Sequence, residues 1–319
     1  MLKFIVINDT RRELNHVGCT TVMACIEKKC ENIILSVSYP RLQEDCFKEK
    51  LKMCDCILVN GEGSLHHDQG IAIDIFRLCL LAKKAKKKIF LINSVWEGNI
   101  VLDEQANIFD KVYVRESFSQ LKLKNIGVKS SVVADLSFYH ELADRELMKR
   151  YYNRIYIDSW YDDVSIFLAE KSYKEKAPFF KMADLKNKTK KTVIRKIINK
   201  LFPVKNTPSL TYSSFDVLSN RGVCITGRFH GATLAISSGF PIVAIGSNTH
   251  KVQGLLYDVF GDTWMEMYIS PDILNEDILE KKIRYVEDNY ISIKQKLDEY
   301  TAKAKSDIEH MFYDIVNCE

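Results

Sequence analysis

Short apolar runs alternate with segments of helical periodicity along most of the chain, and this alternation restricts the possible folds more than any other feature of the sequence. The runs are apolar throughout, which is typical of strands buried on both faces of a sheet. Strands that are separated by helices pair in parallel, with helices covering both faces. In the first half of the chain, strands are expected at residues 4–7, 33–37, 56–59, 89–92, 112–114 and 131–133.

The length of 319 residues fits two domains better than one, because a single core rarely serves more than about 250–300 residues. We expect a first Rossmann-like domain at residues 1–145 and a second at 146–290. Strands of the second domain are expected at 154–158, 223–225 and 241–244. Residues 291–319 are expected to form a C-terminal helix that packs back on the first domain. The predicted fold class is α/β, with two Rossmann-like domains facing across a cleft.

The composition is that of a globular protein, with 46% hydrophobic and 28% charged residues and no run of about 20 apolar residues. The first nine residues read as a strand entering a loop, without the basic lead and cleavage site of a secretory leader, so the cytoplasm is the expected compartment. Nine cysteines is an odd number, and several of them sit among apolar residues. They are therefore expected to be free, buried thiols without a disulfide framework.

A basic segment between Lys171 and Lys205 contains 12 Lys or Arg residues and two acidic residues, although the whole chain carries a net charge of only +4. Within it, residues 190–202 place apolar side chains at helical spacing opposite the lysines. Two interpretations stay open: a helix lying on the inner-membrane surface, or a surface helix packed on the second domain. The segment lacks interleaved aromatic residues that stack on bases, so nucleic acid is not an expected partner.

The strongest candidate site is a polar turn between an expected strand and an expected helix, Gly227-Arg228-Phe229-His230-Gly231. Ligands of open parallel sheets collect at the carboxyl ends of strands, and the free N–H groups at a helix start attract anions. Arg228 offers a two-pronged donor for carboxylate or phosphate, and His230 can move a proton near neutral pH. The alternative is an Arg–His pair that only caps the turn.

A second polar turn follows the expected strand at 56–59 and includes Gly61, Glu62 and Gly63. The glycines allow a ligand to approach the backbone closely, and the carboxylate of Glu62 could act as a general acid, a general base or a nucleophile. The turn lacks the third glycine of a dinucleotide fingerprint, so no such cofactor is expected. His66, His67 and Asp68 are expected to line the cleft and not to bind metal, because three adjacent side chains at a helix start rarely converge on one ion.

Further candidates come from loops at the same sheet edges. On the acceptor side, the residues expected to line the cleft are Asn8, Asp9, His16, Asn60, Ser64, His66 and His67. In the second domain, Asn248, Thr249 and Lys251 link a strand to a helix, where Lys251 is well placed to meet phosphate. Arg115 follows another strand and can either support the anion site or form an internal ion pair with Glu116 or Asp135.

These motifs resemble the polysaccharide pyruvyltransferase family. The resemblance rests on Asn60-Gly61-Glu62-Gly63-Ser64-Leu65, on Val114-Arg115-Glu116-Ser117 with a later Gly127 and Asp135, and on Thr226-Gly227-Arg228-Phe229-His230-Gly231 with Gly239-Phe240-Pro241 and Lys251. The segments follow one another in the order that the family shows. The resemblance implies a fold like that of GT-B glycosyltransferases, with the acceptor on the N-terminal domain and the donor on the C-terminal domain.

The resemblance also implies a reaction in cell-surface polysaccharide synthesis, in which pyruvate passes from phosphoenolpyruvate to a sugar hydroxyl as a ketal. Arg228 and His230 match the family's Arg-x-His pair, which implies that they hold the donor and act on it. The implied donor-binding residues are Arg228, Lys251, Gly227, Gly231, Asn248, Thr249 and Arg115. Glu62 and His230 would exchange protons with the enol carbon and the acceptor hydroxyl. No metal or cofactor is expected, because fixed cations can neutralise the developing phosphate charge.

Glu62 stands where members of that family commonly carry glycine, and this departure keeps a second reaction open. A carboxylate in the cleft would suit a GT-B-type glycosyltransferase that uses a nucleotide-activated sugar, including an acidic, CMP-linked one, with Glu62 as the catalytic carboxylate. The expected partners are therefore a phosphoenolpyruvate or nucleotide-sugar donor and a glycan or lipid-linked saccharide acceptor. A peripheral position on the cytoplasmic membrane face, through residues 190–202, is a further hypothesis. A third, weaker interpretation is a non-catalytic protein that binds phosphate or nucleic acid through residues 171–205.

Overall fold

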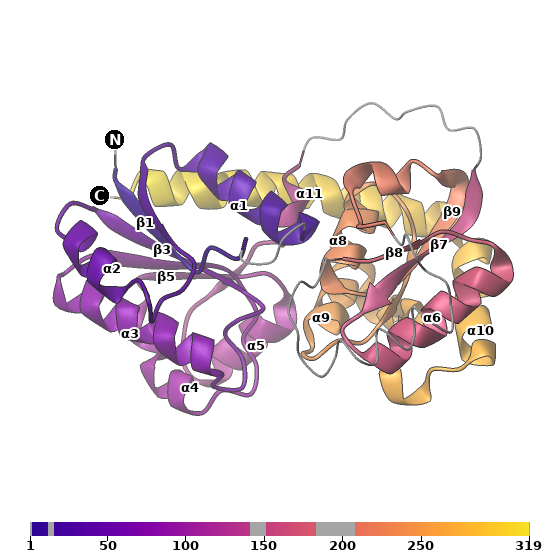
Figure 1. Cartoon of the computed structure of the whole chain (residues 1–319), viewed down its shortest axis with the longest axis horizontal. Helices are drawn as coiled ribbons and strands as arrows, with labels where there is room; N and C mark the ends of the chain where they lie inside the picture. Colours follow the sequence, from indigo (N-terminus) through magenta and orange to yellow (C-terminus); the bar gives the residue numbers. More distant parts are fainter. Residues whose placement is uncertain (1, 12–15, 141–150, 183–207, 319) are drawn as a thin grey trace.

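The computed structural model describes residues 2–11, 16–140, 151–182 and 208–318. They contain two sheets of parallel strands, which lie side by side in two domains (Figure 1). The first sheet has the order β2-β1-β3-β4-β5-β6 and the second the order β11-β10-β9-β7-β8. Every pair of neighbouring described strands runs parallel. The predicted α/β class with two Rossmann-like domains is confirmed, while the boundaries at residues 145 and 290 stay predictions.

The elements of the first sheet and its helices follow the predicted alternation. The strands are β1 (Phe4–Ile7), β2 (Ile33–Val37), β3 (Cys56–Glu62), β4 (Lys88–Ser94), β5 (Lys111–Val114) and β6 (Ser131–Val132). The helices are α1 (Val17–Lys29), α2 (Glu44–Leu51), α3 (Gly70–Lys84), α4 (Val101–Gln105) and α5 (Ser117–Asn125).

The second sheet and the helical tail contain both expected and unexpected elements. The strands are β7 (Tyr152–Ser159), β8 (Phe179–Phe180), β9 (Leu218–Gly227), β10 (Ile242–Ile245) and β11 (Tyr268–Ile269). The helices are α6 (Asp162–Glu175), α8 (Phe229–Ser237), α9 (Lys251–Phe260), α10 (Glu276–Asp288) and α11 (Tyr290–Val316). The short strands β8 and β11 at the sheet edges and helix α6 were not among the expected elements.

Alternate residues of the first sheet enter two different cores. Phe4 and Val6 pack in a core that also contains residues of α1 and α11, whereas Ile5 and Ile7 pack with residues of α2 and α3. This two-sided burial explains why the strands are apolar throughout. The core on the α1 side continues into the second domain, so the two domains share one hydrophobic cluster.

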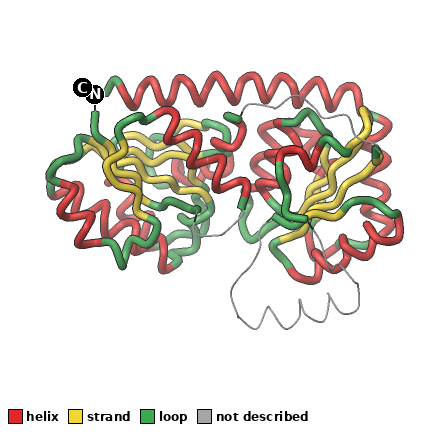
Figure 2. The backbone as a smooth tube through the Cα atoms, turned by 45° about the horizontal axis from the view of Figure 1, so that its top comes forward, coloured by secondary structure: helices red, strands yellow, loops and turns green. Residues whose placement is uncertain are grey.

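Helix α11 runs along both domains and returns the C-terminus to the N-terminus (Figure 2). The Nζ atom of Lys29 lies 2.6 Å from the carboxylate of Glu309, and that of Lys111 lies 3.6 Å from Asp314. These contacts confirm the hypothesis that the tail packs back on the first domain. Within the described residues, no helix combines the length and apolar character needed to cross a bilayer. All nine cysteines are free thiols, as predicted.

Part of the basic segment has a structural role. Lys171 lies in α6, and its Nζ atom forms ion pairs with Glu175, Glu276 and Glu280 at 3.1, 2.9 and 2.8 Å. Its side chain is therefore neutralised inside the second domain and does not offer a positive charge to a partner, which corrects the interpretation of this residue. Residues 190–202 lie outside the described residues, so both interpretations of that stretch stay predictions.

The domains meet through α1 against α8 and α5 against α9. Gly254 in α9 lies against Glu116, where an added Cβ atom would come within 2.2 Å of a carboxylate oxygen. His250, just before α9, lies between two carboxylates of the first domain: its Nδ1 is 3.4 Å from Glu97 and its Nε2 is 3.3 Å from Glu116. Burial lowers the pKa of His250, but the hydrogen bonds and charges of Glu116 and Glu97 outweigh burial and raise it to about 9.

This interdomain pair predicts a specific pH dependence of stability. The folded-state pKa of His250 is raised from 6.5 to about 9, so its stabilisation is fully present below pH 6.5 and is lost as the pH rises to about 9. The shift corresponds to on the order of 3 kcal/mol. We expect the free energy of unfolding, measured with denaturant from pH 6 to 9.5, to fall more steeply in the unmodified chain than in His250→Gln.

The substitution His310→Gln provides the matched control, because His310 is exposed on α11. Identical pH profiles for the unmodified chain and His250→Gln would show that the interdomain pair does not stabilise the fold.

Candidate active site at the domain interface

The candidate site lies where the strand order reverses in each sheet. β1 and β3 are neighbours although the chain visits β2 between them, and β7 and β9 flank the corresponding point in the second sheet. Such reversals open a crevice at the carboxyl ends of the strands, where ligands of α/β folds bind. Ile7 pairs with Val59, and Ser159 pairs with Gly227, so the loops that follow these residues emerge side by side.

Glu62 ends β3 with a positive φ of 37° and turns its carboxylate inward. It accepts hydrogen bonds from the Thr10 hydroxyl and from Nδ2 of Asn60 at 3.2 Å, and the Cys19 thiol lies 3.5 Å from its other oxygen. Burial raises the pKa of Glu62, although the Thr10 hydrogen bond opposes that effect. The carboxylate is thus enclosed by its own domain, at the edge of the interface.

The predicted asparagines hold the Glu62 turn in place. Nδ2 of Asn8 donates to the carbonyl of Asn60 at 2.6 Å and to the Ser64 hydroxyl at 3.1 Å. Nδ2 of Asn93 donates to the side-chain oxygen of Asn60 at 3.3 Å. All of these side chains are buried. Asn8, Asn60 and Ser64, expected to contact the acceptor, therefore form a network that fixes the turn.

Two other residues of the predicted acceptor side have partners within the first domain. Asp9 forms a two-pronged ion pair with Arg11, with nitrogen–oxygen distances of 3.0 and 2.6 Å, so its carboxylate is neutralised. His16 caps α1, where its Nδ1 accepts from the backbone N–H of Cys19 at 3.2 Å. The His16 ring also meets the His230 ring edge to face, with centroids 5.3 Å apart. His16 therefore lies at the interface, while its contact with an acceptor stays a prediction.

In the loop after Glu62, one histidine is buried and the next is exposed to solvent. His66 is buried, His67 is exposed, and their Nδ1 atoms are 2.8 Å apart. Burial, followed by the charge of Lys251, lowers the pKa of His66 to about 4. Asp68 accepts from the backbone N–H groups of residues 100–102 and so caps α4.

A cluster of positive charge forms from both domains beside Gly63. A Cβ atom added at Gly63 would lie 3.7 Å from Nη2 of Arg115 and 3.7 Å from Nζ of Lys251. Arg115 is buried, pairs with Asp135 at 3.1 Å, and places its guanidinium 4.1 Å from the centre of the Phe229 ring. Of the two predicted roles of Arg115, the structure contains the internal ion pair, with Asp135 as the partner, whereas its support of an anion site stays a prediction.

Lys251 is the titratable cation of this cluster. Burial, followed by repulsion from Arg115 and Arg228, lowers the pKa of Lys251 to about 7. Its Nζ donates to the side-chain oxygen of Asn248 at 2.7 Å. An anion between these cations would relieve the repulsion and favour the charged lysine. Thr249, next to Asn248, is buried.

Arg228 follows β9 and is held by a residue that was not among those predicted from the sequence. Its Nε and Nη2 atoms donate to the two oxygens of Asp158 at 3.1 and 2.8 Å. Gly227 and Gly231 allow close packing in this turn, because added Cβ atoms would lie 2.3 Å from Ser159 and 2.4 Å from Thr226. Asp158 is the penultimate residue of β7, so its place at the same sheet edge was the signal that could have identified it.

His230 is the second residue of α8 and is buried against the first domain. Its Nε2 is 3.7 Å from Asp135, and a Cβ atom added at Gly18 of α1 would lie 2.5 Å from its Nδ1. Burial lowers the pKa of His230 to about 3, although the charge of Asp135 opposes this effect. Burial raises the pKa of Asp135, but the charges of His230 and Arg115 outweigh burial and lower it. Gly18 and Asp135 thus hold the imidazole from two sides.

The structure brings most predicted residues to one interface. Those that meet there are Glu62, Arg115, His16, His66, Arg228, His230, Asn248, Thr249 and Lys251, together with Thr10, Cys19, Asp135 and Asp158. Thr10 and Cys19 carried no distinctive sequence signal, because a threonine in a loop and a cysteine in an amphipathic helix are commonplace. The catalytic and binding roles of all these residues stay predictions.

Comparison with known proteins places the chain in a family context. A family model described as Polysaccharide pyruvyl transferase matches residues 11–249, which include Glu62, Arg115, Arg228 and His230 and end two positions before Lys251. Among curated proteins, none matches the sequence.

Solved structures resemble the chain over nearly its full length. A UDP-N-acetylglucosamine 2-epimerase has a TM-score of 0.55 at 10% identity, covering 100% of this chain and 97% of that chain. The S. aureus MnaA–UDP co-structure has a TM-score of 0.54 at 11% identity, covering 93% and 91%. The glycosyltransferase of kitacinnamycin has a TM-score of 0.52 at 8% identity, covering 97% and 95%. At these identities the likeness shows the fold alone, and the predicted GT-B-like arrangement is confirmed.

The space beside Gly63 provides a direct test of the anion site. We expect Gly63→Ala to fold normally, because the new methyl group meets its neighbours at an ordinary contact distance of 3.7 Å. The methyl group would occupy the position between the two cations, so the affinity for a phosphorylated donor should fall at least about tenfold. Isothermal titration calorimetry with phosphoenolpyruvate or inorganic phosphate measures this loss.

Gly70→Ala is the matched control, because an added Cβ atom at Gly70 has no neighbour within 4 Å. Unchanged anion affinity in Gly63→Ala would exclude this space as the binding site.

Proposed function

This chain belongs to the polysaccharide pyruvyl transferase family, and we propose that it transfers pyruvate from phosphoenolpyruvate to a sugar as a ketal. Family membership makes it a transferase that modifies glycans. The observation that most directly supports this donor is the meeting of Arg115 and Lys251, from different domains, beside Gly63. Phosphoenolpyruvate carries a phosphate and a carboxylate, and fixed cations are matched to such neighbouring anionic groups.

In the proposed complex, Arg115, Lys251 and Arg228 bind the donor anions. Asn248 holds Nζ of Lys251, and Asp158 holds the guanidinium of Arg228, so neither cation has to be ordered when the donor arrives. The start of α8 adds backbone N–H groups near Gly227 and Gly231, and Thr249 precedes the start of α9. The donor thus lies mainly on the second domain, with Arg115 reaching it from the first.

The proposed reaction adds a proton to C3 of phosphoenolpyruvate, joins a sugar hydroxyl oxygen to C2, and breaks the bond between C2 and the phosphate oxygen. A second hydroxyl oxygen then bonds to C2 and completes the ketal. The two hydroxyl groups lose two protons, of which one balances the proton gained at C3 and the other leaves with inorganic phosphate. We assign proton delivery to Glu62, whose pKa is raised by burial, and removal of a hydroxyl proton to His230, whose Nε2 lies 3.7 Å from Asp135.

The second candidate is glycosyl transfer from a nucleotide-activated sugar, with Glu62 as the catalytic carboxylate. The observation that favours it is the shared fold with the S. aureus MnaA–UDP co-structure. Against it stands the enclosure of the Glu62 carboxylate by Thr10, Asn60 and Cys19, which leaves little room for direct attack on a sugar. We therefore place pyruvyl transfer first.

The acceptor in this proposal is a glycan or a lipid-linked saccharide, bound on the side of the first domain near His16 and His66. A lipid-linked acceptor would place the enzyme at the cytoplasmic face of the membrane. Residues 190–202 are the segment proposed to contact that surface, and they lie outside the described residues.

Ligand-dependent stabilisation separates the two reactions. A ligand that binds only the folded chain raises the midpoint of thermal unfolding. We expect phosphoenolpyruvate to raise that midpoint in the unmodified chain and to lose the effect in Arg228→Lys, because a lysine cannot reproduce the two-pronged pair that orients the guanidinium. Stabilisation by cytidine or uridine nucleotides, with none by phosphoenolpyruvate, would overturn the proposed donor.

Turnover provides the corresponding catalytic test. Release of inorganic phosphate with a glycan acceptor should fall by about 10²–10⁴-fold in His230→Ala, the usual contribution of a positioned acid or base. His310→Ala, on the exposed face of α11, is the control that should retain full turnover. Equal turnover in both variants would remove His230 from the mechanism.

The pKa of Lys251 predicts how donor binding varies with pH. Because this pKa is about 7, the fraction of charged lysine falls as the pH rises from 6 to 8. The groups that influence Lys251 are Arg115, Arg228, Glu97, Glu62 and His66, with Asn248 as its hydrogen-bond partner. The part of the phosphoenolpyruvate affinity that comes from the charge of Lys251 should therefore weaken between pH 6 and pH 8. In Lys251→Arg that weakening should vanish, because arginine stays charged.

The phosphate of the donor itself gains charge near pH 6, so the informative quantity is the difference between the two proteins. Calorimetric affinities at pH 6, 7 and 8 measure this difference, with the exposed-site variant Lys122→Arg as control. Parallel pH profiles in the unmodified chain and Lys251→Arg would exclude Lys251 from donor binding.

A further inference from the structure

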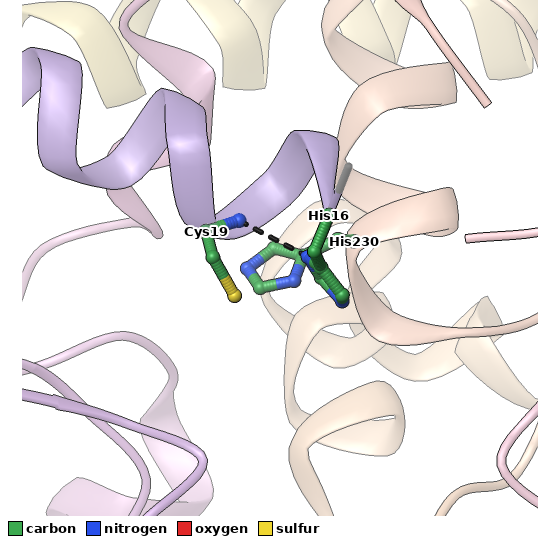
Figure 3. A group of neighbouring side chains, drawn as sticks. All are labelled: His16, Cys19 and His230. Carbon is green, nitrogen blue, oxygen red and sulfur yellow. Dashed lines mark hydrogen bonds between the residues drawn. The ribbon is translucent and has the colours of Figure 1, made fainter. Parts of the chain in front are cut away.

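Two imidazoles and a thiol meet where α1 faces α8 (Figure 3). His16 caps the start of α1, Cys19 lies in its first turn, and His230 lies in the first turn of α8 in the other domain. One potential ligand atom from each residue lies within 4.8 Å of the other two. Cys19 and His230 are buried and His16 is half-buried, so the cluster is largely shielded from solvent.

We propose that His16, Cys19 and His230 form a binding site for a divalent transition-metal ion of borderline softness, such as Zn²⁺. Imidazole nitrogen and thiolate sulfur are the donors that Zn²⁺ selects, whereas Mg²⁺ and Ca²⁺ select oxygen. Zinc–nitrogen distances of about 2.0–2.1 Å and a zinc–sulfur distance of about 2.3 Å place tetrahedral ligand atoms roughly 3.3–3.6 Å apart. The ligand atoms lie within 4.8 Å of one another, so they need to approach by at most about 1.5 Å, which side-chain rotation at a domain interface can supply.

The surroundings of His230 support this assignment. The Nδ1 edge of its ring faces Gly18, between His16 and Cys19 in α1. Its Nε2 is buried, makes no hydrogen bond within the described residues, and lies 3.7 Å from Asp135. A metal ion on Nδ1 would leave the proton on Nε2, where the Asp135 carboxylate can accept it. This is the carboxylate–histidine–metal arrangement that orients ligands in many metal sites.

The other two ligands also have suitable neighbours. The Cys19 thiol lies 3.5 Å from Glu62, which can receive the proton that the thiol loses on binding metal. His16 would bind through Nε2, so its Nδ1 would carry the ring proton. Nδ1 would then no longer accept the hydrogen bond from the Cys19 N–H, which at 3.2 Å is long. Three protein ligands leave a fourth position for water or substrate, as in open metal sites.

The inference concerns metal binding and holds whichever group the enzyme transfers. It departs from the metal-free site expected from the sequence, because His16 and His230 are brought together only by the packing of the two domains. If the proposed pyruvyl transfer is correct, a metal ion on His230 occupies the imidazole that accepts the hydroxyl proton. The metal-loaded chain is then the inactive form.

Binding of Zn²⁺ and Co²⁺ to the full, chelator-treated chain tests the proposal without reference to activity. We expect one equivalent to bind, and the Co²⁺ form to show thiolate-to-metal charge-transfer absorption together with intense visible bands of tetrahedral cobalt. Cys19→Ser and His16→Ala should each weaken binding more than about 100-fold, which exceeds the usual effect of losing an outer contact. Cys46→Ser is the control, because Cys46 is an exposed thiol outside the site.

Each result either supports or overturns the site. Thermal unfolding of Cys19→Ser and His16→Ala establishes that both variants are folded. If one of them does not fold, His230→Ala provides a further variant that lacks a proposed metal ligand. Binding that survives in folded Cys19→Ser, or a Co²⁺ spectrum without thiolate absorption, would overturn the proposal. Failure of the unmodified chain to bind either metal, with intact transferase activity, would overturn the metal site alone. Tight metal binding without phosphoenolpyruvate turnover in the metal-free chain would instead count against the proposed transfer.

Discussion

The buried ion pair between Arg115 and Asp135 is the interaction on which the rest of the site depends. Both residues belong to the first domain, yet Arg115 stacks on Phe229 and Asp135 faces His230, so the pair fixes the start of α8 in the second domain. Removing one member of a buried pair typically costs about 3–5 kcal/mol, because the other charge is left without compensation. The pair therefore links the two domains and sets the local charge.

Burial at this interface gives the other ionisable groups their unusual properties. It disfavours the charged form of Lys251, raises the pKa of Glu62 and keeps His230 uncharged. Two cations held close together in such surroundings favour an anion strongly, since attraction is weakly screened where water is excluded. The packing of α1 against α8 at this interface places ligand atoms of His16, Cys19 and His230 within 4.8 Å of one another. The proposed donor site and the proposed metal site thus depend on one physical feature, a buried interface made by two domains.

The sequence predicted the fold and the sheet edges well, because both follow from local patterns. Apolar runs and helical periodicity located β1, β3 and β9, and strand ends then located Glu62 and Arg228. What the sequence could not predict is which strand-end residues pair across space. Asp158 holds Arg228, and Thr10 and Cys19 enclose Glu62, through contacts that exist only after the sheets form. The charge pattern of the sequence likewise did not predict which lysines are paired. Lys171 belongs to a basic segment of the sequence, yet it forms an ion pair inside the second domain with Glu280 of α10.

The central claim is that both domains bind one anionic donor at their interface. Hydrogen exchange followed by mass spectrometry, with and without phosphoenolpyruvate, measures this most directly because it reports backbone protection in each domain separately. The account predicts slower exchange both in the turn around Gly63 and at the starts of α8 and α9. Protection confined to one domain, or located away from these segments, would contradict it.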